Sequence, residues 1–166
     1  MIPPQKQMTG MLGHPVAENP IDIMFDAVYA HYGLNWQFWK NDIATEADLA
    51  LAVSALAPLG YRGVGITVPY KVAVIPMLDE VDDDVRAIGA ANYVTIKDGR
   101  LTGHSNDGKG VVKAIEKVVP LAGQHVVMLG AGGAGRAMAV EIAWAGAAQV
   151  TLETRREAQG RGDAEH

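Results

Sequence analysis

The sequence has 166 residues, with 14 basic and 19 acidic side chains, a formal net charge of −5 and no cysteine. An acidic balance argues against nonspecific nucleic-acid binding, which needs a basic face that displaces counterions. The absence of cysteine excludes disulfides and thiolate metal sites. Residues 1–10 lack the apolar core of a secretion signal, and no apolar run approaches the roughly 20 residues that span a bilayer. We therefore expect a cytoplasmic protein without a membrane segment.

The first two thirds of the chain alternate strand-like and helix-like segments. Strands are expected at 8–12, 36–42, 63–68, 92–96 and 100–104, the last two joined by the hairpin signal Lys97-Asp98-Gly99. Asn19 followed by Pro20 predicts a helix start with proline in the first turn, and Thr45 predicts a second. That second helix is expected to bury Leu49, Val53, Leu56 and Leu59 on one face. The acidic run 80–84 suits the start of a third helix, because carboxylates favour the positive end of its dipole.

The last third has a different pattern. A helix is expected over 108–119, followed by a strand–helix–strand unit. Its first strand is expected to be buried because its apolar run is unbroken, and its second strand is also expected to be buried. The alternation predicts an α/β fold. We divide it into an amino-terminal α/β substrate domain (1–104), the first strand–helix–strand unit of a Rossmann domain (105–153), and a polar tail (154–166).

A glycine-rich turn separates the first strand of that unit from its helix. It matches G-x-G-x-x-G, the pattern in which the glycines permit a tight turn, close approach to a pyrophosphate and close helix–strand packing. Free N–H groups at the helix start then face the phosphates. The predicted dinucleotide-binding residues of the turn are Gly130, Ala131, Gly132, Gly133, Ala134 and Gly135.

The end of the second strand bears on which nicotinamide cofactor binds. An acidic residue there accepts the ribose hydroxyls of NAD, whereas arginine receives the 2′-phosphate of NADP. The sequence has Glu153 and then Thr154, Arg155 and Arg156. We expect NADP, with NAD as the alternative if the two arginines only begin a solvated tail.

Lys71 and Asp107 are candidates for acid–base chemistry. Reduction of a ketone needs a proton carrier near the new hydroxyl group, and a lysine oriented by a carboxylate can serve. Without further information, Lys71 would be interpreted as an ordinary surface lysine and Asp107 as an ordinary helix cap. The five histidines show no metal-ligand spacing, so no metal site is predicted.

Four segments in order give the chain its family resemblance. GITVPYK, IGAANYV, GHSNDGKG and GAGGAGRA resemble signatures of the shikimate/quinate dehydrogenase family, and the likeness runs from Gly13 to about Arg156. The resemblance implies a substrate domain followed by a Rossmann domain, with the active site between them. It also implies reversible reduction of 3-dehydroshikimate to shikimate, usually with NADPH.

The same resemblance assigns roles to individual residues. Lys71 would be the catalytic lysine and Asp107 its partner, while Thr67 and Asn92 would bind substrate hydroxyl groups. Asn19 lies at the first of two serine positions that, in the family, bind the substrate carboxylate.

Some positions depart from the family pattern. Ile21 replaces the second serine, and Gly65 and Ser105 replace asparagines. Each lost hydrogen bond costs on the order of 1–3 kcal/mol in a buried site. A related cyclic keto acid is therefore an alternative substrate.

Only two of about six Rossmann strands are readable. We expect such a unit to leave apolar faces and a sheet edge uncovered, which a homodimer or another association would cover. The isolated chain is therefore expected to lack dehydrogenase activity, or to need a partner that supplies the missing strands. A truncated, catalytically inactive relic or a small-molecule binding module of the same fold is the alternative function.

Overall fold

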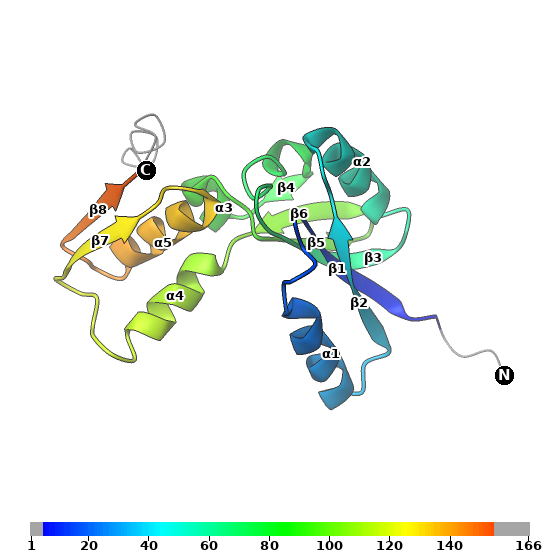
Figure 1. Cartoon of the computed structure of the whole chain (residues 1–166), viewed down its shortest axis with the longest axis horizontal. Coiled ribbons are helices and arrows are strands. Elements are labelled where there is room, and N and C mark those ends of the chain that lie inside the picture. The colour runs from blue at the N-terminus through cyan, green and yellow to red at the C-terminus, as the bar shows by residue number, and fades with distance from the viewer. Residues whose placement is uncertain (1–4, 155–166) are drawn as a thin grey trace. The chain divides into compact units, whose positions relative to one another are not determined.

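The computed structural model describes residues 5–154 (Figure 1). The chain forms two compact units, and each is described by itself. The first unit contains the residues up to 81 together with 93–103. The second contains 82–92 and the residues from 104 onward. The chain therefore leaves the first unit after residue 81 and returns to it for a hairpin.

A six-stranded mixed sheet forms the centre of the first unit, in the order β2-β1-β3-β5-β6-β4. β1 runs parallel to β2 and β3, β3 is antiparallel to β5, and β4 is parallel to β6. The strands are β1 Gln7–Gly13, β2 Trp36–Asp42, β3 Tyr61–Ile66, β4 Glu80–Val81, β5 Tyr93–Lys97 and β6 Arg100–His104. All five predicted strands are therefore confirmed, and β4 is an additional one.

Helix α1 (Ile21–His31) packs its apolar side against β1 and β2. Phe25 stacks on Phe38 with ring centroids 4.6 Å apart, and Tyr29 shares a buried hydrogen bond of 2.5 Å with Thr9. Full burial of one such large apolar side chain contributes roughly 1.5–3 kcal/mol. This cluster therefore holds the β1–α1–β2 crossover together.

The helix starts agree only in part with their predictions. Helix α2 (Glu46–Leu56) begins as predicted, with the hydroxyl of Thr45 accepting a hydrogen bond from the N–H of Asp48 at 3.1 Å. In α1 the proline is the N-cap itself, not a first-turn residue, and Asn19 Oδ1 accepts from the N–H of Ile21. The prediction that Leu59 is buried was wrong, because α2 ends at Leu56 and Leu59 is 59% exposed.

Two turns complete the first unit. A 3₁₀ turn, η1 (Ile75–Met77), follows β3, and the predicted hairpin turn joins β5 to β6. Asp98 and Gly99 have φ angles of 51° and 80°. Positive φ at both central residues is the requirement of a type I′ turn, which matches the twist of the flanking strands.

The second unit packs three helices beside a two-stranded parallel sheet. Its elements are α3 Asp83–Ile88, α4 Asp107–Ile115, β7 His125–Leu129, α5 Gly133–Trp144 and β8 Gln149–Glu153. α3 starts inside the acidic run as predicted, with Asp82 as its cap, but the beginning of that run forms β4. Helix α4 begins one residue earlier than predicted and ends at Ile115 instead of 119.

Helices α4 and α5 approach closely at Gly108. A Cβ atom there would lie 2.7 Å from the carbonyl carbon of Ala137 and 2.6 Å from Cγ of Glu141. Beside this contact, Lys109 forms an ion pair with Asp84 and lies 3.9 Å from Glu141. Burial raises the pKa of Glu141, and the charge of Lys109 opposes that rise.

The α/β fold class, with a strand–helix–strand unit at its end, is confirmed. The prediction that β7 and β8 are buried was wrong, because neither strand has a fully buried residue. Val127 is 65% exposed and Leu129 87% exposed. A sheet of two strands leaves these side chains without neighbours, so an uninterrupted apolar run does not become a buried strand here.

Candidate active site

The carboxyl ends of three parallel strands, β1, β2 and β3, gather several candidate residues at one edge of the first unit's sheet. Thr67 donates its N–H to the carbonyl of Leu12 at 3.0 Å, and His14 donates its N–H to the carbonyl of Val68 at 2.9 Å. A side chain in place of Gly13 would collide with Thr67. The loop after β1 and the loop after β3 are therefore held together, as expected where parallel sheets bind ligands.

Tyr70 anchors the loop that carries Lys71. Its side chain is 2% exposed, and its hydroxyl donates to the carbonyl of Ile43 at 2.7 Å. Burial raises the pKa of Tyr70, and the nearby carboxylates of Glu46, Asp48 and Asp42 raise it further. The sequence assigned Tyr70 no role, and the structure makes this residue the internal support of the Lys71 loop.

The loop after β1 is held in place by Lys40. Its ammonium donates to the carbonyls of Ala17 and Asn19 at 3.0 and 3.1 Å, and it pairs with Asp22 at 3.1 Å. The hydrogen bond from Lys40 lowers the pKa of Asp22. At the other end of the loop, Nδ1 of His14 lies 2.7 Å from Oδ1 of Asp42. The charge of Lys40 is thus already matched within the protein.

In the second unit, an amide and a carboxylate from two of the family signatures meet. Asn92 donates through Nδ2 to Oδ1 of Asp107 at 2.7 Å and to Oδ1 of Asn106 at 2.6 Å. The N–H of Asn106 returns a bond to Oδ1 of Asn92 at 3.1 Å, and the N–H of Asn92 donates to the carbonyl of His104 at 2.9 Å. The first residue of α4, Asp107, is thereby fixed to the segment after α3.

The glycine turn between β7 and α5 is open on one side and closely packed on the other. Among the described residues, no atom lies within 4 Å of a Cβ built at Gly130 or Gly132, whereas a Cβ at Gly135 would lie 3.1 Å from the carbonyl carbon of Gly130. The N–H of Gly130 donates to the carbonyl of Glu153 at 2.8 Å, which ties the turn to the end of β8. The open side of the turn fits a pyrophosphate, and the closed side fits tight helix packing.

The predicted site residues fall in both units. Lys71, Thr67 and Asn19 belong to the first, and Asn92, Asp107 and the glycine turn belong to the second. That Lys71 and Asp107 act on one ligand stays a prediction. Thr154 follows β8, whereas Arg155 and Arg156 lie outside the described residues.

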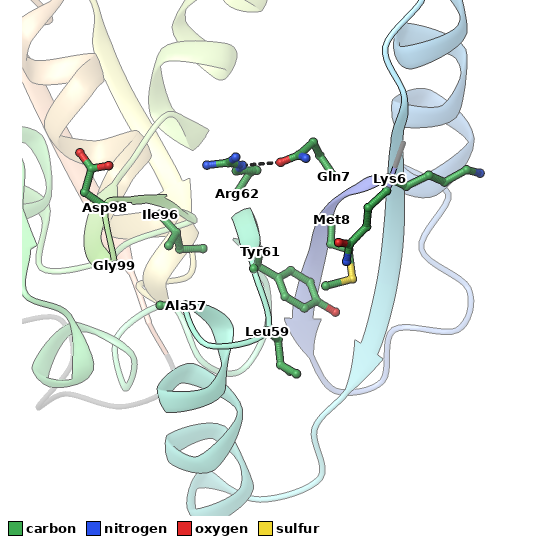
Figure 2. Close-up of a pocket in the computed structure, with 12 residues that line it drawn as sticks. Lys6, Gln7, Met8, Ala57, Leu59, Tyr61, Arg62, Ile96, Asp98 and Gly99 are labelled. Carbon is green, nitrogen blue, oxygen red and sulfur yellow. Dashed lines mark hydrogen bonds between the residues drawn. The ribbon is translucent and has the colours of Figure 1, made fainter. Parts of the chain in front are cut away.

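A pocket of about 370 Å³ lies at the opposite edge of the first unit's sheet (Figure 2). It opens at the amino ends of β1 and β3, where Nε of Arg62 donates to Oε1 of Gln7 at 2.5 Å. Tyr61 and Leu59 line it from below in the view of Figure 2. None of the predicted site residues lines this pocket, so we do not include it in the candidate active site.

Within residues 5–154, no group of three or more histidine, aspartate or glutamate side chains could hold a metal ion. In the same part of the chain, every helix is too short or too polar to cross a bilayer.

A mixed α/β unit, followed by a strand, a glycine turn, a helix and a parallel strand, is typical of two-domain dehydrogenases that bind a dinucleotide. Residues 11–94 match the family model described as shikimate dehydrogenase substrate binding domain. The chain belongs to the shikimate dehydrogenase family, as the resemblance predicted.

Individual relatives agree with this assignment. Shikimate dehydrogenase (NADP(+)) of Moorella thermoacetica is 40% identical over 149 residues, which are 89% of this chain and 50% of that protein. The 5-ketofructose reductase of Gluconobacter sp. strain CHM43 is 40% identical with a TM-score of 0.85, over 96% of this chain and 57% of its own. Shikimate 5-dehydrogenase of Thermus thermophilus, solved with NADP(H) and shikimate, is 33% identical with a TM-score of 0.86, over 96% and 60%.

The chain spans about half the length of the curated relatives it matches. These relatives are named as NADP-dependent, which agrees with the predicted cofactor.

Proposed function

We propose that the chain binds NADP(H) and a polyhydroxylated ring ketone, and that its residues serve the reversible reduction of that ketone to an alcohol. 3-Dehydroshikimate or a related cyclic keto acid is the first candidate. The bound cofactor supplies the hydride that reaches the carbonyl carbon. Lys71 gives a proton to the carbonyl oxygen, and takes it back when the alcohol is oxidised. Asp107 orients the ammonium of Lys71, while Thr67 and Asn92 bind substrate hydroxyl groups.

The hydrogen bond between Asn92 and Asp107 is the observation that carries this proposal. A neutral amide donor orients the carboxylate and adds no charge of its own, so it does not compete with an ammonium partner as a second cation would. The N-cap of α4 is Asn106 and not Asp107, and the side chain of Asn106 is bonded to Asn92 instead of to its own helix.

The glycine turn supports the cofactor part of the proposal. Its residues Gly130, Ala131, Gly132, Gly133, Ala134 and Gly135 would hold the pyrophosphate. The first N–H groups of α5 have no helical acceptor of their own and suit a phosphate oxygen. Thr154, Arg155 and Arg156 would contact the 2′-phosphate and favour NADP over NAD.

Calorimetric titration of the chain with NADPH and NADH tests the cofactor, and titration with the alcohol and ketone tests the substrate site. Binding is measured first because it tests the cofactor site and the substrate site without depending on turnover. Where NADPH oxidation can be followed by the absorbance of the reduced nicotinamide, Lys71→Met is expected to lower its rate by about 10²–10⁴-fold. The matched control, Lys97→Met, changes an exposed lysine of β5 and should leave the rate unchanged.

The alternative is a noncatalytic relic or small-molecule binding module. Folded protein that binds neither nucleotide would establish it and end the dehydrogenase proposal. We also propose that a homodimer or another association covers Val127 and Leu129. Sedimentation velocity tests this association. A monomer at all concentrations would refute the homodimer.

Reduction of an uncharged keto sugar is a second candidate. The Gluconobacter relative is named for reduction of 5-ketofructose. The carboxylates of Asp42, Glu46 and Asp48, which act on Tyr70 next to Lys71 in the sequence, favour this candidate.

A further inference from the structure

A histidine–aspartate pair lies at the sheet edge that carries Thr67 and Lys71. Nδ1 of His14 is 2.7 Å from Oδ1 of Asp42, and the two side chains are 48% and 52% exposed. The N–H of His14 bonds to the carbonyl of Val68, so the histidine belongs to the same joined loops as Thr67. An exposed ion pair elsewhere on a surface would contribute little. Its place at the carboxyl ends of the parallel strands gives this one a further role.

The pair presents hydrogen-bond acceptors to a ligand. An ionised carboxylate only accepts, so Nδ1 of His14 carries the proton of this 2.7 Å bond. The second oxygen of Asp42 is an acceptor in either charge state of the ring, and in the neutral ring Nε2 is an acceptor as well. Hydroxyl groups satisfy such acceptors, whereas a carboxylate cannot.

The charged groups nearby also disfavour a carboxylate on the substrate. Lys40 is matched by Asp22 and two carbonyl groups. The carboxylates of Asp42, Glu46 and Asp48 act on the buried hydroxyl of Tyr70, which supports the Lys71 loop. A carboxylate on the substrate would meet like charge and unsatisfied acceptors, both of which discriminate against binding.

We infer that His14, oriented by Asp42, is a substrate-contacting residue that determines specificity, and that the site takes an uncharged polyhydroxy ketone in preference to a keto acid. The inference rests on the proposed function and, of its two substrate candidates, prefers the uncharged keto sugar over the keto acid.

Two ligands that differ in charge and by one methyl group test it. The chain is titrated calorimetrically with shikimate and with methyl shikimate, and 5-ketofructose serves as the uncharged sugar probe. We expect the ester and the sugar to bind at least about tenfold more tightly than the acid, a difference of about 1.4 kcal/mol. His14→Ala should weaken binding of the ester and the sugar about three- to tenfold, the value of one hydrogen bond.

Glu80→Gln is the matched control, because it removes one member of the exposed pair with Arg100 in the same unit and should change no affinity. Asp42→Asn keeps the side-chain size and removes the charge, so it should reduce the difference in affinity between methyl shikimate and shikimate. Circular dichroism verifies that each variant is folded. Tighter binding of shikimate than of its ester, or unchanged binding in folded His14→Ala, overturns the inference and leaves the proposed function standing. Binding of none of the three ligands overturns both.

Discussion

Because α4 and α5 approach closely at Gly108, we predict that Gly108→Ala lowers the free energy of unfolding. In Gly108→Ala the new methyl carbon would lie 2.7 Å from the carbonyl carbon of Ala137. Carbon atoms in contact are ordinarily about 3.5–4.0 Å apart, so the two helices would have to separate by roughly 1 Å. Overpacking of this kind costs about 1–3 kcal/mol. The neighbouring backbone cannot yield as a flexible side chain would.

Gly110→Ala is the control within the same helix. Among the described residues, no atom lies within 4 Å of a Cβ at Gly110, so only the helix propensity changes. That change stabilises by up to about 1 kcal/mol. The same gain is present in Gly108→Ala and offsets part of its clash. The two single-methyl variants should therefore differ in opposite directions from the wild type.

Urea unfolding followed by circular dichroism measures the two free energies. Hydrogen exchange, read by mass spectrometry on peptides from α4 and α5, locates the effect in the second unit, with α2 as internal reference. We expect faster exchange in α4 and α5 of Gly108→Ala and unchanged or slower exchange in Gly110→Ala. Equal stability of the two variants would refute the reasoning, because it would mean that the helices do not meet at Gly108.

Three further predictions concern the glycine turn, a helix cap and a buried acid. Gly132→Ala should fold normally and bind NADPH more weakly, whereas Gly135→Ala should lose both stability and binding; equal melting temperatures would contradict this. Thr45→Ala removes the acceptor for the N–H of Asp48 and should cost about 0.5–2 kcal/mol in chemical unfolding. Because burial raises the pKa of Glu141, the folded state favours its neutral form, and stability falls as pH rises from the ordinary glutamate pKa through that raised value. Glu141→Gln should therefore stabilise the folded protein at pH 7, and this gain in stability should vanish below about pH 4. Thermal melting at several pH values measures the gain, and a gain that is independent of pH would contradict the prediction.

Local patterns predicted the elements well where the signal itself is local. Thr45 caps its helix because a hydroxyl before a helix can reach an N–H three residues later. Asp98 and Gly99 form the hairpin turn because both tolerate positive φ. The predictions that failed depended on distant neighbours. Leu59 lies beyond the end of α2, and Leu129 is exposed although its strand is apolar throughout.

The candidate site shows the same division. The residue types of Lys71, Asp107 and Asn92 could be selected from the sequence by their resemblance to family signatures. The bond from Asn92 to Asp107 could not, because it joins segments on either side of a hairpin that belongs to the other unit. The pair of His14 and Asp42 was also missed, since no spacing links residues that meet only through parallel strand pairing.

By itself, the sequence determined the family, the order of most strands and helices, and the glycine turn at 130–135, because each depends on residues within one turn or one short signature. Tertiary structure alone decided which side chains meet at the carboxyl edge of the sheet, how closely α4 approaches α5, and which apolar residues stay exposed. Those outcomes depend on strand register and helix contact across long separations in the chain, where a shift of one residue moves every side chain to a new neighbour.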